Sequence, residues 1–296
     1  MARSFPPDVV VLDRDSLIHV RVGRGRKDAK IVQAKSYALR DDIFAPGVVT
    51  PSLQNEAAFA DVLRRLKLET GRWDKVSILV PDSWIRMNII ELQSVPERAN
   101  ETEEVIRWSL RRTMPIDPSL LRLSYEVLSR TPARVLAFSA VEATLAAIER
   151  LFSAAGVEVI LLEPCGLNIW NAITSREALT TRDRIFFYIR ENDFTTAVFR
   201  GPQPLFIRSR NLDGERSLEQ EIKLSATYLR DSLQTSSIEN CYVAGNDVSG
   251  SVVDAIGVEF SAPVRKITLR DVAEQVPGDS SHYEAELTAA TGVFTG

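Results

Sequence analysis

The chain has few of the residues that most often hold metals or act as nucleophiles. Its 296 residues include two histidines and two cysteines. His19 and His282 are far apart, and Cys165 and Cys241 form no CxxC pair, so the spacing predicts neither a metal site nor a disulfide. The two thiols are expected to be reduced and partly buried. GxSxG, P-loop and HExxH motifs are also absent, so no common hydrolase or nucleotide motif is present.

Long apolar runs and an excess of basic residues are missing as well. No stretch approaches the roughly 20 apolar residues that a membrane-spanning helix needs. The N-terminal MARSFPPDVVVLDRDS contains no apolar signal-peptide core. The formal net charge of −4 argues against nucleic-acid binding, because proteins that neutralise phosphates normally carry a basic excess. We therefore expect a cytoplasmic protein that binds no nucleic acid and reaches a membrane only through a partner.

What the chain does contain is a repeated order of strands and helices. The first half opens with predicted strands at 8–12, 17–22 and 31–39. A helix follows, which Ser52 would cap and Gly71 would end. Its apolar face consists of Phe59, Val62, Leu63 and Leu66.

The second half repeats this order after a polar boundary. Its predicted strands are 184–190, 195–199 and 204–209. The helix that follows begins with Ser217 and Gln220 in a capping-box pattern. Such an internal repeat predicts an α/β protein with two related lobes, residues 1–178 and residues 179–296.

A differently built stretch, residues 77–128, interrupts the first lobe. Its predicted strands and apolar run are 77–80, 85–92 and 121–128. Between them lies a short helix with Asn100 as the predicted N-cap, acidic residues in its first turn and arginines in its last, an order that suits the helix macrodipole. Met114-Pro115 would end this helix, because the residue before proline is disfavoured in the α region.

Four short elements of this stretch follow one another in a fixed order. They are Val80-Pro81, Glu103-Glu104, Met114-Pro115-Ile116 and Tyr125-Glu126-Val127. In this order they resemble the inserted subdomain of PilM-type type IV pilus assembly proteins, which belong to the actin-like ATPase superfamily and are related to FtsA. The C-terminal segment Ala289–Val293 also resembles the segment that closes this fold.

The resemblance implies a particular architecture. It is a two-lobed actin-like fold of duplicated RNase H-like lobes, with a small α/β subdomain inserted into the first lobe at about residues 82–157. The C-terminal segment would return to the first lobe.

Actin-like ATPases hold Mg-ATP between their lobes with two Asp-x-Gly turns and a Gly-Gly turn. In the first turn of this chain Asp13 and Ser16 remain, but Asp15 replaces the glycine. At an effective dielectric constant of about 20, two like charges about 4 Å apart cost roughly 4 kcal/mol. The first turn is therefore a poorer phosphate site than the family's turn.

The other two turns are altered as well. No Asp-x-Gly register survives in Arg190–Thr196, although Asn192 can adopt a left-handed turn. In the third turn Gly245 is followed by Asn246 instead of a second glycine. The candidate residues of this degenerate nucleotide cleft are Asp13, Ser16, Asn192 and Gly245. We expect no ATP hydrolysis, no bound cofactor and no metal.

The resemblance then implies a binding function. PilM-type proteins capture the N-terminal cytoplasmic peptide of a single-span PilN-type inner-membrane protein in a groove between the first lobe and the inserted subdomain, and a pilus motor ATPase is a further possible partner. The candidate groove residues here are Trp84, Arg86, Arg107, Trp108 and Arg111, because tryptophan and arginine are common interface anchors. The same residues also fit a buried core and a solvated helix face.

Two alternatives remain open at this point. One is an actin-like or sugar-kinase-like enzyme that binds and hydrolyses ATP between its lobes. The other is an FtsA-like protein, which would end in an amphipathic membrane helix, whereas no such helix is expected before Gly296.

Overall fold

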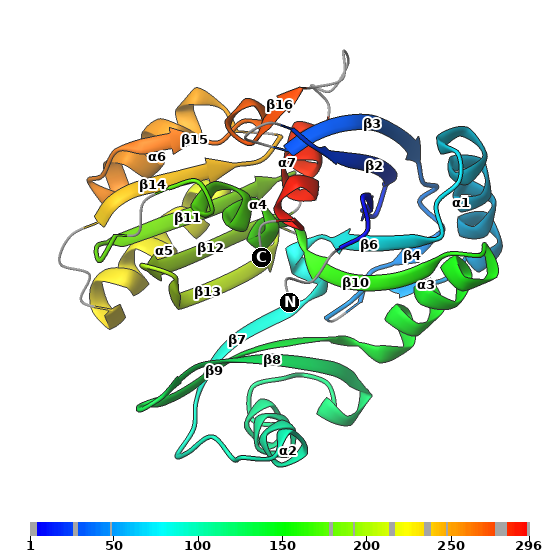
Figure 1. The fold of residues 1–296 in the computed structure, drawn as a ribbon. Helices are drawn as coiled ribbons and strands as arrows, with labels where there is room; N and C mark the ends of the chain where they lie inside the picture. The colour runs from blue at the N-terminus through cyan, green and yellow to red at the C-terminus, as the bar shows by residue number, and fades with distance from the viewer. Residues whose placement is uncertain are drawn as a thin grey trace.

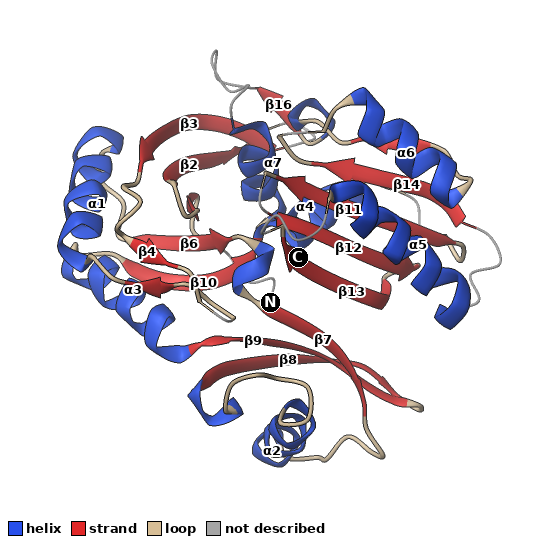
Figure 2. Ribbon diagram, turned by 180° about the vertical axis from the view of Figure 1, so that it is seen from behind, coloured by secondary structure: helices blue, strands red, loops and turns tan. Residues whose placement is uncertain are grey.

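The computed structural model describes residues 5–25, 29–47, 49–177, 180–191, 193–212, 217–233, 238–246, 248–275 and 283–294. Two α/β lobes lie side by side, and a smaller subdomain extends from one of them (Figure 1 and Figure 2). Within the described residues, no helix combines the length and the apolar composition that crossing a membrane requires.

The first lobe is built on a six-stranded sheet in the order β10-β6-β1-β2-β3-β16. These strands are β1 (Asp8–Leu12), β2 (Ser16–Arg24), β3 (Ala29–Ala38), β6 (Lys75–Val80), β10 (Glu158–Pro164) and β16 (Ala273–Gln275). Every residue of β1 is buried, which its sequence DVVVL suits because both faces of the sheet are covered. Helices α1 (Glu56–Thr70) and α3 (Glu142–Ala154) lie next to each other beside this sheet (Figure 1).

The N-terminal cap predicted for α1 is wrong, whereas the predicted end is confirmed. Ser52 lies in β5 (Ser52–Leu53), which pairs with β4 (Phe44–Ala45). Asn55 caps the helix instead, and its side chain accepts a hydrogen bond from the Ala58 amide at 3.0 Å. Gly71 ends the helix with φ 83°, a conformation that favours glycine.

The second lobe contains a five-stranded sheet in the order β13-β12-β11-β14-β15. Its elements are β11 (Asp183–Arg190), β12 (Asp193–Arg200), β13 (Gln203–Asn211), α5 (Leu218–Leu233), β14 (Ile238–Ala244), α6 (Gly250–Phe260) and β15 (Val264–Lys266). The capping box before α5 is confirmed, since Ser217 and Gln220 exchange hydrogen bonds of 3.0 and 3.3 Å. In both lobes three antiparallel strands lead through a helix to a parallel strand, which confirms the predicted duplication.

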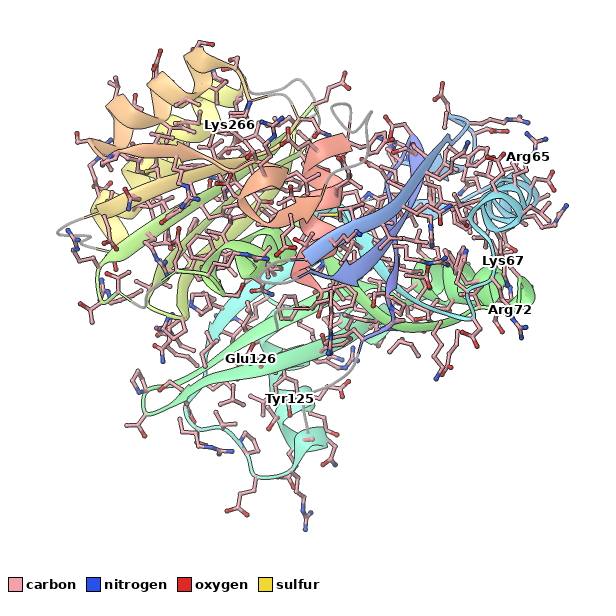
Figure 3. All side chains as sticks on the ribbon, turned by 45° about the horizontal axis from the view of Figure 1, so that its top comes forward. Arg65, Lys67, Arg72, Tyr125, Glu126 and Lys266 are labelled. Atoms are coloured by element: carbon pink, nitrogen blue, oxygen red, sulfur yellow. The ribbon has the colours of Figure 1, made fainter. Side chains whose placement is uncertain are left out.

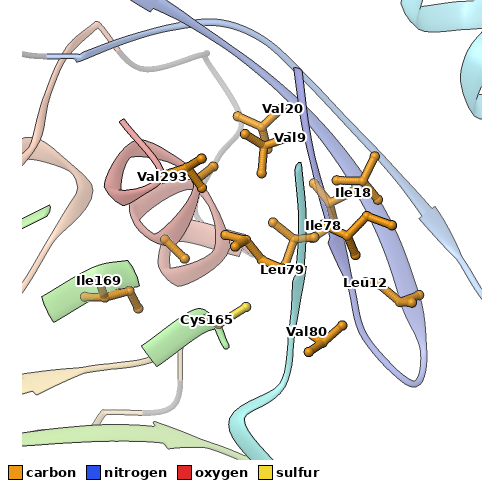
Figure 4. Packing of buried hydrophobic residues seen from close by; sticks show 14 of the residues in the cluster. Val9, Leu12, Ile18, Val20, Ile78, Leu79, Val80, Cys165, Ile169 and Val293 are labelled. Carbon is orange, nitrogen blue, oxygen red and sulfur yellow. The ribbon is translucent and has the colours of Figure 1, made fainter. Parts of the chain in front are cut away.

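Two helices that cross each other connect the lobes: α4 (Cys165–Thr174) and α7 (Glu284–Gly292). They approach so closely that a Cβ on Gly292 would lie 1.8 Å from the Asn168 carbonyl oxygen. Pro164 is the N-cap of α4 and also the last residue of β10. After α7, Val293 packs into the core of the first lobe near Val9 and Ile78 (Figure 4). The C-terminal segment therefore returns to the first lobe.

The inserted subdomain is a three-stranded antiparallel sheet in the order β7-β9-β8, with one helix packed on it. Its elements are β7 (Arg86–Glu91), α2 (Ala99–Leu110), β8 (Leu121–Arg130) and β9 (Ala133–Val141). Three short 3-10 helices are also found in the described residues: η1 (Asp82–Trp84), η2 (Pro118–Leu120) and η3 (Leu269–Asp271). Tyr125 and Glu126 lie on β8, as the motif predicts (Figure 3). Asn100 is the second residue of α2 and not its cap, which is Arg98.

The sheet of this subdomain lies within the range of about 82–157 that was expected for the subdomain. Its strands span residues 86–141. The helix α3 that follows belongs with the first lobe, where Lys67 of α1 donates a hydrogen bond to the carbonyl of Gly156, just beyond its end (3.3 Å; Figure 3).

Candidate functional site

A cleft of about 640 Å³ lies between the two lobes, where the sequence placed the nucleotide turns. The β1–β2 turn contributes Asp13 and Asp15, and the β11–β12 turn contributes Arg190, Glu191 and Asp193. The first turn is closed by a hydrogen bond from the Asp13 amide to the carbonyl of Ser16 (2.8 Å). Asn192, the candidate in the second turn, lies outside the described residues.

Arg190 joins the two lobes at the base of this cleft. Its guanidinium forms an ion pair with the Asp13 carboxylate and a second one with Glu286 of α7, at 3.0 Å from Nη2 to Oε1. Asn246 completes the network by donating from Nδ2 to both Glu286 oxygens, each at 3.0 Å. We call Asp13, Arg190, Asn246 and Glu286 the interlobe polar cluster. The three turns that the sequence assigned to nucleotide binding are thus linked to one another by the side chains of Arg190 and Glu286.

The third turn owes its glycine to packing. A Cβ on Gly245 would lie 1.7 Å from the carbonyl oxygen of Ile189, and the residue has φ 143°. A larger residue would push β14 away from β11, to which it is paired. Gly245 is therefore explained by the close approach of these strands and by its positive φ.

Buried carboxyl groups surround the cluster. Burial raises the pKa of Asp82 to about 7, although its Oδ1 accepts a hydrogen bond from the Gly166 amide at 2.7 Å. Burial also raises the pKa of Asp193 to about 6 and raises that of Glu286. Burial by itself would lower the pKa of Arg190, but the neighbouring acidic groups raise it overall. Arg190 consequently stays charged and compensates the buried carboxylates.

These residues fit a magnesium-bound triphosphate poorly. The guanidinium of Arg190 already neutralises Asp13, the residue that the resemblance assigns to the metal. Glu286 and Asn246 bond to each other at the turn that would receive the nucleoside. Among the described residues, no group of three or more histidine, cysteine, aspartate or glutamate side chains is arranged to hold a metal ion.

The structure does not bring the five candidate partner-binding residues into one groove. Trp84 is 3% exposed and packs against Phe44 with the two rings tilted and 5.0 Å between their centroids, and with Arg86 it lines the interlobe cleft. Arg107 pairs with Glu103 at 2.7 Å and donates to the carbonyls of Pro118 and Leu121, so it holds α2 to the start of β8. Trp108 and Arg111 are exposed, and Trp108 lies on the side of α2 opposite to Ile106 and Leu110, which pack against the inserted sheet.

A second groove, which sequence reasoning did not find, separates the first lobe from the inserted subdomain. It has a volume of about 330 Å³ and is bordered by β8, β9, β10 and α3. Both β8 and β10 are edge strands of their sheets. We call it the sheet-edge groove. The run 157–162 is mainly apolar in the sequence, but a linear sequence does not show that the strand formed here ends a sheet beside another open edge.

The walls of the sheet-edge groove are mainly apolar. Leu123, Phe138 and Leu162 line it, and so does Ile160, which is 40% exposed at an irregularity of β10. Ser139 is 2% exposed, and its Oγ has no hydrogen-bond partner within the described part of the chain.

The charges of this groove are compensated internally. Arg122 forms two hydrogen bonds to Glu142, at 2.7 and 2.8 Å, and two more to Glu149. These carboxylates raise the pKa of Arg122. The groove therefore offers a mainly apolar surface beside an ion-pair cluster of one arginine and two glutamates, with the Ser139 hydroxyl buried and unpaired beneath it.

Among the solved structures that are similar to this chain, three are informative. The "PilM-PilN type IV pilus biogenesis complex" matches over 96% of both chains, with a TM-score of 0.77 and 17% identity. A Bacteroides thetaiotaomicron protein with actin-like ATPase fold and unknown function matches over 95% of both chains (TM-score 0.58, 11% identity). The cytoplasmic domain of EpsL, an inner-membrane component of the type II secretion system of Vibrio cholerae, matches over 98% of this chain and 94% of that one (TM-score 0.52, 9% identity).

No protein-family model and no curated protein sequence matches this chain. Its likeness to known proteins is therefore structural and extends over nearly its whole length. The chain has the two-lobed actin-like fold of PilM-type proteins, with the inserted subdomain in the first lobe.

Proposed function

We propose that this chain is a PilM-like scaffold of a type IV pilus or related secretion machine, which binds a partner segment in the sheet-edge groove and hydrolyses no ATP. Two of the similar structures support the assignment to such a machine, since one is a PilM-PilN complex and another belongs to an inner-membrane secretion component. In this proposal the partner is a PilN-type single-span membrane protein. The chain would then be peripheral at the inner membrane through this partner.

The observation that carries the proposal is the pair of open sheet edges at one apolar groove. An edge strand exposes backbone N–H and C=O groups that an extended peptide can pair with. The side chains of such a peptide would alternate between the groove and solvent. Leu123, Phe138 and Ile160 suit apolar side chains, and the hydroxyl of Ser139 suits one buried polar group. The occupant is therefore a short, extended, mainly apolar segment, in keeping with the N-terminal cytoplasmic peptide of the partner.

The absence of ATP hydrolysis is supported by the interlobe polar cluster. A nucleotide would have to displace Arg190 from Asp13 and Glu286 before its phosphates and metal reached the first turn. That exchange would leave buried carboxylates next to an anionic ligand, which costs several kcal/mol per unpaired ion. The role of the cleft is then structural: it fixes the relative position of the lobes.

A binding measurement tests the groove. The probe is a synthetic peptide carrying the N-terminal cytoplasmic segment of the PilN-type protein from the same genome, titrated by calorimetry. Ile160→Arg places a charge in the apolar groove and should weaken binding by about tenfold or more. Leu68→Arg is the matched control, because Leu68 is 82% exposed on α1, outside the groove. Equal affinities of the two variants would contradict the groove assignment.

A further inference from the structure

One side of α2 remains unexplained by the groove or the cleft. Six residues of this helix and the turn after it project from that side: Glu101, Glu104, Val105, Trp108, Arg111 and Arg112. With 3.6 residues per turn, all of them lie within about 60° of Trp108 around the helix axis. The opposite side carries Thr102, Ile106 and Leu110, which are buried against the inserted sheet. We call the six residues the α2 outer face.

The α2 outer face is exposed and directed away from both lobes. Trp108 is 63% exposed and Val105 is 36% exposed. In Figures 1 and 2, α2 covers the side of the inserted sheet that is remote from the rest of the molecule. Tryptophan is enriched at the centres of protein interfaces, where a rigid apolar ring is enclosed by polar neighbours.

The charges of this face are arranged in two groups. Glu101 and Glu104 precede Trp108, and Arg111 and Arg112 follow it. Glu104 and Arg112 form no ion pair within the described part of the chain, and Glu101 makes only a 3.4 Å contact with Arg98. The helix macrodipole favours this order of charges. It does not account for an exposed tryptophan between the two groups.

We propose that the α2 outer face binds the same face of a second copy of this chain in an antiparallel pair. Along the sequence, Arg107 lies midway between the two charge groups: the mean position of Glu101 and Glu104 is as far before it as the mean position of Arg111 and Arg112 is after it. A twofold axis near Arg107 would therefore set the acidic group of each copy against the basic group of the other and bring the two Trp108 rings together. A parallel pair would set like charges against each other. The face is thus complementary to itself in one orientation only.

The size and charge of the face determine the strength of this contact. A stable specific interface buries about 1,200–2,000 Å², more than one pair of short helices provides. The dimer should therefore be weak, and salt should weaken it further because its charges are exposed. Weak contacts become populated when a partner gathers several copies on a membrane. The α2 outer face is separate from the sheet-edge groove, and its self-association does not require the proposed partner.

Sedimentation equilibrium of the full chain at rising protein concentration tests the inference. The wild type should show a reversible monomer–dimer equilibrium. Trp108→Ala should raise the dimer dissociation constant by about tenfold or more, since the ring supplies most of the apolar contact. Leu68→Ala, which removes an exposed apolar side chain from α1, should leave it unchanged. A wild type that remains monomeric, or a dimer that persists in Trp108→Ala, would overturn the proposal.

Two charge-reversal variants then test the charge pairing between the two copies. Glu101→Arg with Glu104→Arg makes the whole face basic, and Arg111→Glu with Arg112→Glu makes it acidic. Each variant alone should be monomeric, because like charges would meet across the axis. An equimolar mixture of the two should form a heterodimer, since both contacts then join opposite charges. Circular dichroism of each variant shows that it is folded. A mixture of folded variants that stays monomeric would overturn the antiparallel pairing.

Discussion

Arg190 and Asp13 form an ion pair across the boundary between the two lobes, at the end of β11 and in the turn after β1. Both side chains are largely buried, with exposed fractions of 15% and 12%. The same guanidinium reaches Glu286 on α7. One protein cation thus connects three parts of the chain at the position where actin-like ATPases are expected to need a metal and phosphates.

Removing this cation should destabilise the protein strongly. In Arg190→Ala, Asp13 and Glu286 stay buried without their partner, and the free energy of unfolding should fall by about 3–5 kcal/mol. The matched control is Arg182→Ala. Arg182 is 62% exposed and pairs with Glu239 at the surface, so its loss should cost no more than about 1 kcal/mol. Urea unfolding of the three proteins makes the comparison, and equal losses in the two variants would show that the cluster is not a structural clamp.

A soluble cation should replace the missing side chain. The truncation in Arg190→Ala leaves a space bordered by two carboxylates, which guanidinium ion matches in charge and planar shape. Millimolar guanidinium chloride should raise the melting temperature of this variant but not that of the wild type. Sodium chloride at the same ionic strength is the control for screening. Equal effects of both salts on the variant would refute a specific cation site.

The same cluster predicts the behaviour toward nucleotide. Mg-ATP should give no saturable heat in calorimetry, no shift in melting temperature and no phosphate release, because Arg190 and Asp15 disfavour the metal and the phosphates at the first turn. A Mg-ATP-binding actin-like ATPase measured in the same buffer shows that the assay detects binding. Saturable binding with magnesium-dependent phosphate release would establish the ATPase alternative instead.

The features of the fold that depend on local sequence were predictable. Strand runs, the capping box of Ser217 and Gln220, and the end of α1 at Gly71 involve only neighbouring residues. The predicted cap Ser52 failed because a distant partner decides its role, since it pairs with Ala45 in the β4–β5 ladder. Asn100 failed although the interactions involved are local, since α2 begins at Ala99. The hydroxyl of Thr102 accounts for the early start of α2 by bonding the carbonyls of Pro96 and Arg98 (both 3.2 Å).

The candidate site was predictable only in part. The sequence shows that three nucleotide turns have changed, but not that Arg190 reaches Asp13 and Glu286, since these residues come together only when the lobes meet. The environment of Trp84 likewise depends on a residue that is distant in the sequence. Its neighbour Phe44 comes from β4, far away in the chain, and this packing turns a plausible surface anchor into a core residue.

Asp82 makes the stability of the protein depend on pH. Burial raises its pKa to about 7, above its value of 3.8 in an unfolded chain. Between these two values the unfolded state has released the proton, whereas the folded state still holds it. The contribution of Asp82 to folding is therefore complete below pH 4 and is lost progressively as the pH rises toward 7. Asp193, with a pKa of about 6, acts in the same direction over a narrower range.

Asp82→Asn should remove most of this dependence, because asparagine resembles the protonated acid and keeps the oxygen that accepts from the Gly166 amide. The variant should exceed the wild type in unfolding free energy at pH 8, by on the order of 2–4 kcal/mol, and approach it near pH 4. Asp254→Asn on the exposed side of α6 is the control and should run parallel to the wild type. The measurement is urea unfolding from pH 4 to pH 8. If the difference between Asp82→Asn and the wild type is constant over this range, Asp82 is already ionised in the folded protein. In that case the guanidinium of Arg190 compensates the acidic residues around it strongly enough to offset the effect of their burial.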